Sequence, residues 1–408
     1  MKRKTYIGQW LGDWYEIFTH ELRLIFKDSG VMIIFFLAGI AYPILYNLIY
    51  HNGSVEDMPI AVVDESSSAD SRRYIQKLDS TPEVEVAFTC INMDEAKALM
   101  QQRKVKGIVY FPEDYSDNLT ALRQATLSTY ADMSSFLYYK NLTMAANHVM
   151  LDEVESIQAE RYAAAGFSGQ MASQLIKAIP YEENIPFNRN FSYTIFFICA
   201  ALMIVIQQTM FYGTSMLAGT MREQNHSFAM MPDRLKGVGI SRVVLGRGAA
   251  YWLIYMGIGV YVSVLVPKMF GLPQLGRYTD IIILLLFYVT ACVMFCFTFS
   301  TLIRRRETVF VLFLFMSPIC LFLTGFSWPA TSFPEVWKWF SYLFPSTFAA
   351  RAFINLNTAG ATLPMVAGEM AALAIQTIVY YILACAAVFG ENIYLKKRSS
   401  KMEKGLAG

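Results

Sequence analysis

The chain has 408 residues, of which 55% are hydrophobic and only 16% are charged, whereas about a quarter of the residues of soluble domains are charged. This composition predicts an α-helical polytopic membrane protein. The net charge of +2 does not indicate nucleic-acid binding, because the basic residues stand at the ends of apolar segments, where membrane topology places them. We therefore expect contact with membrane lipid and none with nucleic acid.

Residues 1–30 have the pattern of an amphipathic helix that precedes a membrane span. Apolar residues recur at steps of three and four, namely Leu11, Trp14, Tyr15, Phe18, Leu22, Ile25 and Phe26. Residues 31–50 follow as a first apolar segment, long enough to cross a bilayer. We predict that the amphipathic helix lies in the cytoplasmic membrane interface. An ordinary soluble helix is the alternative.

Residues 51–190 form the one large polar block. Short β-rich runs at 59–63, 84–88 and 107–111 alternate with charged helical runs at 69–78 and 94–103. Residues 127–130 could add a strand, and a helical pattern follows from residue 135 to residue 179. The alternation predicts an α/β domain with a partly parallel sheet, inserted between the first and second membrane helices.

Further apolar segments bring the number of predicted membrane helices to six; they cover residues 191–219, 249–266, 281–303, 309–328 and 370–394. Residues 191–395 therefore form a bundle. Basic residues gather in the loop 220–248, at Arg304–Arg306 and in the tail 396–408, whereas the opposite loops are poorer in them. The positive-inside rule then places both termini in the cytoplasm and residues 51–190 outside.

Residues 329–357 stay apolar after the fifth predicted span but are broken by Pro329, Pro334 and Pro345. Ser332 and Glu335 have the spacing of a capping box, which predicts a helix start. The two segments between the prolines are too short to span a bilayer. We predict a re-entrant hairpin; the alternative is a surface loop whose aromatic residues anchor it at the headgroups.

The sequence carries no motif for catalysis or for a cofactor. It has no Gly-Lys pair for a phosphate loop and no Gly-x-Ser-x-Gly, and its four histidines are scattered. We interpret Cys292 and Cys296, which share a helix face, as buried small hydrophobic residues. The spans lack charges through their centres, unlike most ion-coupled transporters. Asn47, Gln207 and Gln208 could line a path or bond between helices.

Several segments in order carry a resemblance to a known family. They are Pro-Ile-Ala-Val-Val-Asp at 59–64, Lys-Gly-Ile-Val-Tyr-Phe-Pro at 106–112, the basic segment from Arg222 to Pro232, and the proline-rich stretch 324–348. With the helix before the first span, they make the chain resemble the type-2 permeases of ATP-binding-cassette exporters, particularly bacterial members with a large external domain. Family members often carry a Gly-Thr signature where Glu223 is here followed by Gln-Asn-His-Ser-Phe.

The resemblance implies a half-transporter in a bacterial inner membrane that is not itself an enzyme. ATP and magnesium would bind to separate cytoplasmic ATPase subunits, and a second copy or a paralogue would complete the path. The coupling residues would be Arg222, Glu223, Pro232, Asp233, Arg234 and Lys236, with the amphipathic helix as a second contact. The hairpin would gate the outer end through Phe340, Phe344 and Phe348, which could equally be packing residues.

We thus expect export of an amphipathic, drug-like or lipid-like substrate, because uncharged spans disfavour highly charged cargo. The external domain could dock a periplasmic adaptor with an outer-membrane channel, bind substrate, or pair with its own copy. Two other classes remain open at this point. One is a membrane-anchored sensor or scaffold with an external ligand-binding domain, and the other is a secondary transporter.

Overall fold

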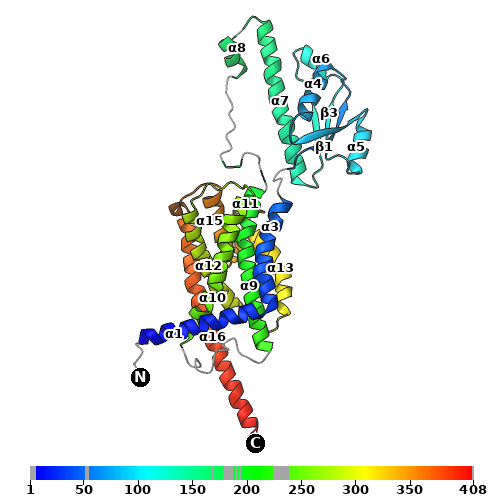
Figure 1. The fold of residues 1–408 in the computed structure, drawn as a ribbon. Coiled ribbons are helices and arrows are strands. Elements are labelled where there is room, and N and C mark those ends of the chain that lie inside the picture. Colours follow the sequence, from blue (N-terminus) through cyan, green and yellow to red (C-terminus); the bar gives the residue numbers. More distant parts are fainter. Residues whose placement is uncertain are drawn as a thin grey trace. The chain divides into compact units, whose positions relative to one another are not determined.

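The structure is a computed structural model, and it describes residues 6–50, 55–167, 169–177, 187–188, 192, 194–223 and 239–406. The chain divides into two compact units (Figure 1). One is a helical unit made of Met1–Gly53 and Phe187–Gly408, and the other is an α/β unit made of Ser54–Pro186. Each unit is described by itself.

Helix α9 (Cys199–Glu223) lies at the centre of the helical unit, and its apolar segment is buried along its whole length. A helix that is hydrophobic on all sides belongs inside a bundle. The elements packed against it include α3 (Gly39–Ile49), α10 (Ile240–Val260), α12 (Tyr278–Ser300), α13 (Thr308–Leu323) and α15 (Pro345–Asn357). Helix α16 (Ala367–Leu406) packs chiefly against α12.

Five helices in the described residues are long and apolar enough to cross a membrane; they are Ser29–Ile49, Cys199–Glu223, Ile240–Met269, Tyr278–Ser300 and Leu363–Glu391. The chain is therefore a multi-pass membrane protein. The remaining predicted span corresponds to α13, which has only 16 residues, whereas a span needs about 20. The sixth span stays a prediction.

Helices α9 and α10 are longer than their apolar segments. Helix α9 continues to Glu223 and α10 begins at Ile240, so the predicted loop 220–248 is helical at both ends. Residues 224–238, between them, lie outside the described residues. The predicted tail 396–408 is helical as far as Leu406. Hydropathy marks where a helix is apolar, but α9 and α10 continue beyond their apolar segments, where Arg222 and Arg242 form ion pairs.

Helix α1 (Tyr6–Lys27) lies across one end of the helical unit, and α15 and α11 (Val266–Met269) lie at the opposite end (Figure 1). We call these the α1 end and the α15 end. Ile17, Glu21 and Ile25 are buried at four-residue steps, which puts them on one side of α1. Other apolar residues of α1, such as Tyr15 and Phe26, lie away from these buried residues and are exposed. One flank of this helix is thus free to contact lipid.

Two short helices follow α13. Helix α14 (Glu335–Ser341) begins after Pro334, and Ser332 makes no capping hydrogen bond to it. The predicted capping box is therefore wrong. The proline forces Phe333 into extended backbone, so Glu335 becomes the first residue of the helix rather than the third. Pro345 then starts α15 in the first turn, where its missing N–H costs nothing.

The α/β unit contains one four-stranded sheet with the order β2-β1-β3-β4. Strand β1 (Met58–Asp64) pairs in parallel with β2 (Val84–Cys90) and β3 (Gly107–Phe111), while β4 (Ser128–Ala131) is antiparallel to β3. The prediction of a partly parallel sheet is confirmed. Parallel neighbours require crossovers, and helices α4 (Ala69–Asp79) and α5 (Met93–Gln101) supply them.

The two faces of this sheet bury different helices. Ile60 and Val62 of β1 pack with residues of α4 and α7 (Phe136–Ala164), whereas Ala61 and Val63 pack with α5. This alternation follows from the two-residue repeat of a strand. Glycines at 166 and 169 have positive φ and separate α7 from the short α8 (Gly169–Ile176).

Candidate functional site

Charged side chains at the α1 end form ion pairs, and Glu223 accepts a backbone hydrogen bond; these contacts join α1, the residues that follow it and the neighbouring helices of the bundle. We call this set the α1 junction; it comprises Asp13, Glu21, Asp28, Arg222, Glu223, Arg242, Arg247, Arg306 and Glu391. Each contact joins segments far apart in the sequence.

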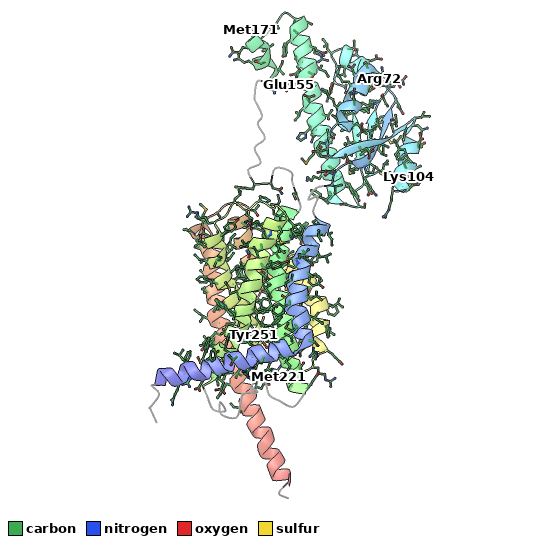
Figure 2. The ribbon with its side chains drawn as sticks, viewed as in Figure 1. Arg72, Lys104, Glu155, Met171, Met221 and Tyr251 are labelled. Carbon is green, nitrogen blue, oxygen red and sulfur yellow. The ribbon has the colours of Figure 1, made fainter. Side chains whose placement is uncertain are left out.

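The centre of the junction is a buried pair between α1 and α10. Arg247 Nε donates to Glu21 Oε2 at 2.8 Å, and its Nη2 donates to Glu21 Oε1 at 2.7 Å. Tyr251, labelled close to α1 in Figure 2, donates its hydroxyl hydrogen to the same Oε1 at 2.8 Å. Glu21 is 2% exposed and Arg247 5%. Removing one partner of such a pair costs about 3–5 kcal/mol.

The backbones of α1 and α10 approach closely beside this pair. A Cβ atom on Gly246 would lie 2.9 Å from Ile17 Cγ2 and 3.3 Å from the Trp14 carbonyl oxygen. Arg242 adds an ion pair with Asp13 at 3.2 Å. Tight packing together with two ion pairs holds α1 on α10, so that displacement of one helix displaces the other.

A second group of contacts joins the start of the first span to α9 and to the loop before α13. Arg306 donates to both carboxylate oxygens of Asp28, at 2.7 and 2.9 Å, and to Thr220 Oγ1 at 2.7 Å. The Arg306 backbone N–H donates to Glu223 Oε1 at 2.8 Å. Asp28 also caps the helix that follows it, through the amides of Gly30 and Val31.

The pKa of Asp28 reflects these partners. Burial raises the pKa of this carboxyl group, but the bonds from Arg306, Val31 and Gly30 outweigh burial and hold it below the ordinary value of 3.8. The hydrogen bond to Asp28 raises the pKa of Arg306 in turn. The pair is therefore charged at neutral pH.

The third contact of the junction ties α9 to α12 and α16. Arg222 Nε donates to Glu391 Oε1 at 3.1 Å, and Nη1 donates to the carbonyl oxygens of Ser300, at 2.7 Å, and Ile303. Arg222 and Glu223, two of the predicted coupling residues, thus make contacts within the chain. The other four, Pro232, Asp233, Arg234 and Lys236, lie outside the described residues. Docking of an ATPase by any of them stays a prediction.

Sequence patterns do not single out Glu21 and Arg247. Hydropathy places the start of the third span at residue 249, which leaves Arg247 in the predicted loop. A signal was present, however, because Glu21 stands four residues from both Ile17 and Ile25, on the side of the helix that they bury. An acidic residue between two buried isoleucines requires a buried cationic or hydrogen-bonding partner.

The three candidate path residues contact helices of their own chain. Asn47 Nδ2 donates to the Pro43 carbonyl oxygen at 2.7 Å. Gln207 Oε1 accepts from the Ser346 backbone N–H at 2.8 Å, so it caps the buried first turn of α15. Gln208 is 6% exposed. Whether any of them lines a path stays a prediction.

The structure brings two of the three candidate gate residues together. The rings of Phe340 and Phe344 lie 5.5 Å apart, edge to face. Phe344 is buried and also contacts Phe295 of α12 at 6.0 Å. Phe348 instead stacks on Tyr342 at 5.4 Å.

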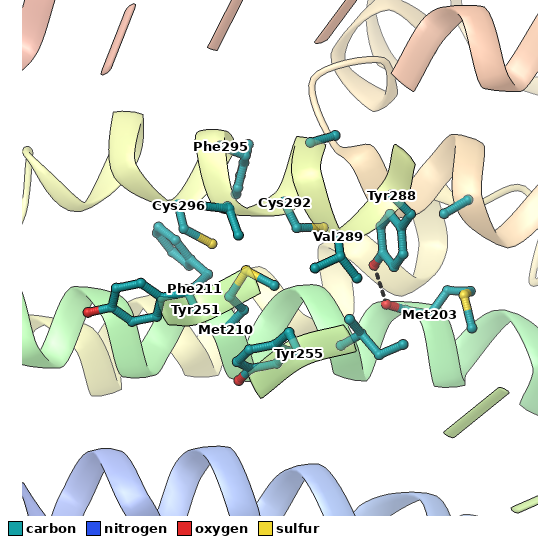
Figure 3. Close-up of a cluster of buried hydrophobic side chains, with 14 of the residues drawn as sticks. Met203, Met210, Phe211, Tyr251, Tyr255, Tyr288, Val289, Cys292, Phe295 and Cys296 are labelled. Atoms are coloured by element: carbon teal, nitrogen blue, oxygen red, sulfur yellow. Dashed lines mark hydrogen bonds between the residues drawn. The ribbon is translucent and has the colours of Figure 1, made fainter. Parts of the chain in front are cut away.

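The interior between α9, α10 and α12 is apolar, with few polar links (Figure 3). The Tyr288 hydroxyl donates to the Met203 carbonyl oxygen. Cys292 and Cys296 are buried there, which agrees with their interpretation as small hydrophobic residues. In the part of the chain that the structure describes, no group of three or more His, Cys, Asp or Glu residues could hold a metal ion.

The comparison with protein families finds a match over most of the chain. The family described as "ABC-2 family transporter protein" matches residues 30–386, which is more than half of the 408 residues. The comparison with curated proteins finds no match. The matched segment begins after α1 and ends before Glu391. The α1 junction therefore joins residues inside the matched segment to residues outside it.

Proposed function

Because this chain belongs to the ABC-2 family of transporter proteins, we propose that it is the permease subunit of an ATP-binding-cassette exporter. Membership of this family makes the chain a transmembrane component that is not catalytic on its own, and implies a partner ATP-binding subunit. The proposal goes further on direction, place and cargo. The chain exports an amphipathic, drug-like or lipid-like substrate across a bacterial inner membrane.

The observation that carries this proposal is the α1 junction. A partner that pulls or pushes α1 must also move α10, because Glu21 and Arg247 form a buried ion pair and Gly246 lets α10 lie close against Ile17 and Trp14. The Asp28–Arg306 pair extends the connection to α9 and α13. Packed helices shift between discrete arrangements, so ATP-driven closure of the partner subunits would switch the bundle.

The orientation of the chain is supported by charge and connectivity. Basic residues gather at the α1 end, as at a cytoplasmic surface. Tyr50 and Phe197, which flank the insertion of the α/β unit, have ring centroids 6.5 Å apart. The insertion therefore leaves and re-enters the helical unit at one place. These features support cytoplasmic termini and an external α/β unit.

The hairpin of α14 and α15 is proposed as the outer gate, with the Phe340–Phe344 contact as its closed state. Its α15 part has a buried first turn, and the capping by Gln207 compensates the amide that would otherwise be unpaired in the membrane. A second permease copy or a paralogue would complete the path. The external unit would dock a periplasmic adaptor, bind cargo or pair with its copy.

The proposal is tested by copurification and transport. The tagged chain is expected to bring down an ATP-binding subunit from membranes, and inverted vesicles that contain the complex are expected to take up cargo when ATP is added to the outside medium. A chain that moves solute in liposomes by an ion gradient alone would be a secondary transporter. A chain that binds an external ligand but brings down no ATPase would be a sensor or scaffold. Either result refutes the proposal.

A further inference from the structure

Arg351 on α15 differs from the other buried or half-buried arginines of the helical unit. In the described residues, each of those others has a carboxylate partner; they are Arg222, Arg242, Arg247 and Arg306. Arg351 has only a long hydrogen bond, from Nε to the Thr324 carbonyl oxygen at 3.4 Å, and no described carboxylate within 4.0 Å. A guanidinium offers five donors, so most of its capacity is unused.

The position of α15 places this arginine within the bundle rather than above it. Ser346 at one end of α15 is bonded to Gln207, and Asn357 at the other end contacts Cys199. Gln207 lies eight residues along α9 from Cys199, which corresponds to about 12 Å of helix. Arg351 lies between these two levels. An unpaired cation at such a place is costly unless an anion or water reaches it.

Arg351 lies on the more exposed side of α15. Phe348, Arg351, Ile354 and Asn355 are half-buried or exposed, at three- and four-residue steps, whereas Ala350 on the other side is fully buried. Arg351 therefore stands on the face that the chain's own helices leave uncovered. Exposed large aromatic residues occur in the same hairpin region, namely Trp328, Trp337, Trp339 and Phe340.

We propose that Arg351 binds the anionic group, a carboxylate or a phosphate, of an amphipathic cargo whose apolar part lies on these aromatic residues. A guanidinium matches such oxyanions with two parallel hydrogen bonds, and an apolar surface around it strengthens them. The inference rests on the proposed function and narrows its substrate to anionic amphiphiles. A neutral or cationic cargo would leave Arg351 without a counter-charge.

The test uses the purified full chain in phosphatidylcholine nanodiscs and radiolabelled dodecyl phosphate as the probe, with empty nanodiscs subtracted. Arg351→Gln is expected to weaken binding at least about tenfold, since a charge-assisted hydrogen bond is lost. Arg351→Lys is expected to retain part of the affinity. Arg277→Gln, the matched control at an exposed arginine, is expected to bind like the unaltered chain, and dodecanol is expected to compete poorly.

Three results would overturn the inference. One is equal binding by the Arg351→Gln chain, and another is an equal loss in the Arg277→Gln chain. The third is abolition of probe binding by phosphatidylglycerol in the nanodisc, which would make a resident lipid headgroup the ligand in place of cargo. Circular dichroism would show whether Arg351→Gln disturbs the fold. If it does, two other results test the inference: partial retention of probe binding by the Arg351→Lys chain, and poor competition by dodecanol.

The assay contains no ATPase, so the two proposals fail separately. If an ATPase copurifies and probe binding does not depend on Arg351, only the inference is refuted. Arg351-dependent binding by a chain that attracts no ATPase would refute the proposed function instead.

Discussion

Replacement of Arg247 by Met would leave the Glu21 carboxylate buried, with the Tyr251 hydroxyl as its one hydrogen-bond donor in the described part of the chain. Methionine fills a volume similar to the aliphatic part of arginine but donates no hydrogen bond. The change therefore isolates the loss of charge and of the two guanidinium bonds from a loss of packing.

The expected cost follows from burial. A surface ion pair contributes about 0–1 kcal/mol, whereas breaking a buried pair by removing one partner costs about 3–5 kcal/mol, because the remaining charge stays uncompensated. Both side chains are almost fully buried, at 2% and 5% exposure, so the larger range applies. The double variant Glu21→Gln/Arg247→Met removes the stranded charge, and its cost is expected to be clearly below the sum of the two single costs.

The measurement is the free energy of unfolding, from titration with a denaturing detergent in mixed micelles. It compares four chains: the unaltered chain, Glu21→Gln, Arg247→Met and the double variant. Gly257→Val is a control for unrelated change on α10, because a Cβ at that position would meet nothing within 4 Å. A loss below about 1 kcal/mol for Arg247→Met would put the pair in the surface class. Additive single costs would show that the two side chains do not interact. Either outcome would refute the reasoning.

The same variants test transmission. The double variant keeps α1 in place by packing and by the Asp13–Arg242 pair, but it lacks the buried ion pair to α10. We therefore expect ATP hydrolysis by the attached partner to continue while transport per ATP falls. Unchanged transport by a stable double variant would show that α1 does not act on α10 through this pair.

Three further predictions concern other contacts of the helical unit. Gly246→Val is expected to weaken the packing of α1 on α10, because its Cβ would meet Ile17 at 2.9 Å. The rate of limited proteolysis within α1 measures this loss, and equal protection of the Gly246→Val and Gly257→Val chains would contradict the prediction. Gln207→Leu is expected to cost about 1–3 kcal/mol, since the buried Ser346 N–H loses its acceptor; unchanged unfolding would exclude the cap. The contribution of Asp28 to the free energy of unfolding is expected to be full above the pKa of this residue in the unfolded chain, near 3.8, and to be lost as the pH falls through its lower pKa in the folded chain. Asp28→Asn should remove that pH dependence, and the same dependence of stability on acid pH in both chains would count against the prediction.

Local sequence patterns determined much of this protein. Apolar length located the five long helices, because the length of a spanning helix is fixed by bilayer thickness. The two-residue alternation of β1 and the helices between the strands predicted the partly parallel sheet. The three- and four-residue repeat of residues 11–26 predicted α1. These signals depend on neighbours a few positions apart.

Only the tertiary structure decided which polar groups are paired. Glu21 and Arg247 are 226 positions apart, Arg222 and Glu391 169, and Gln207 and Ser346 139. No local pattern specifies such partners, because each is chosen by the packing of whole helices. The same packing makes Gln207 the cap of α15, and it leaves Arg351 on an open face with no carboxylate partner among the described residues. Sequence determines where helices form and which are apolar, but the free energy of a buried charge depends on the atoms that surround it after folding.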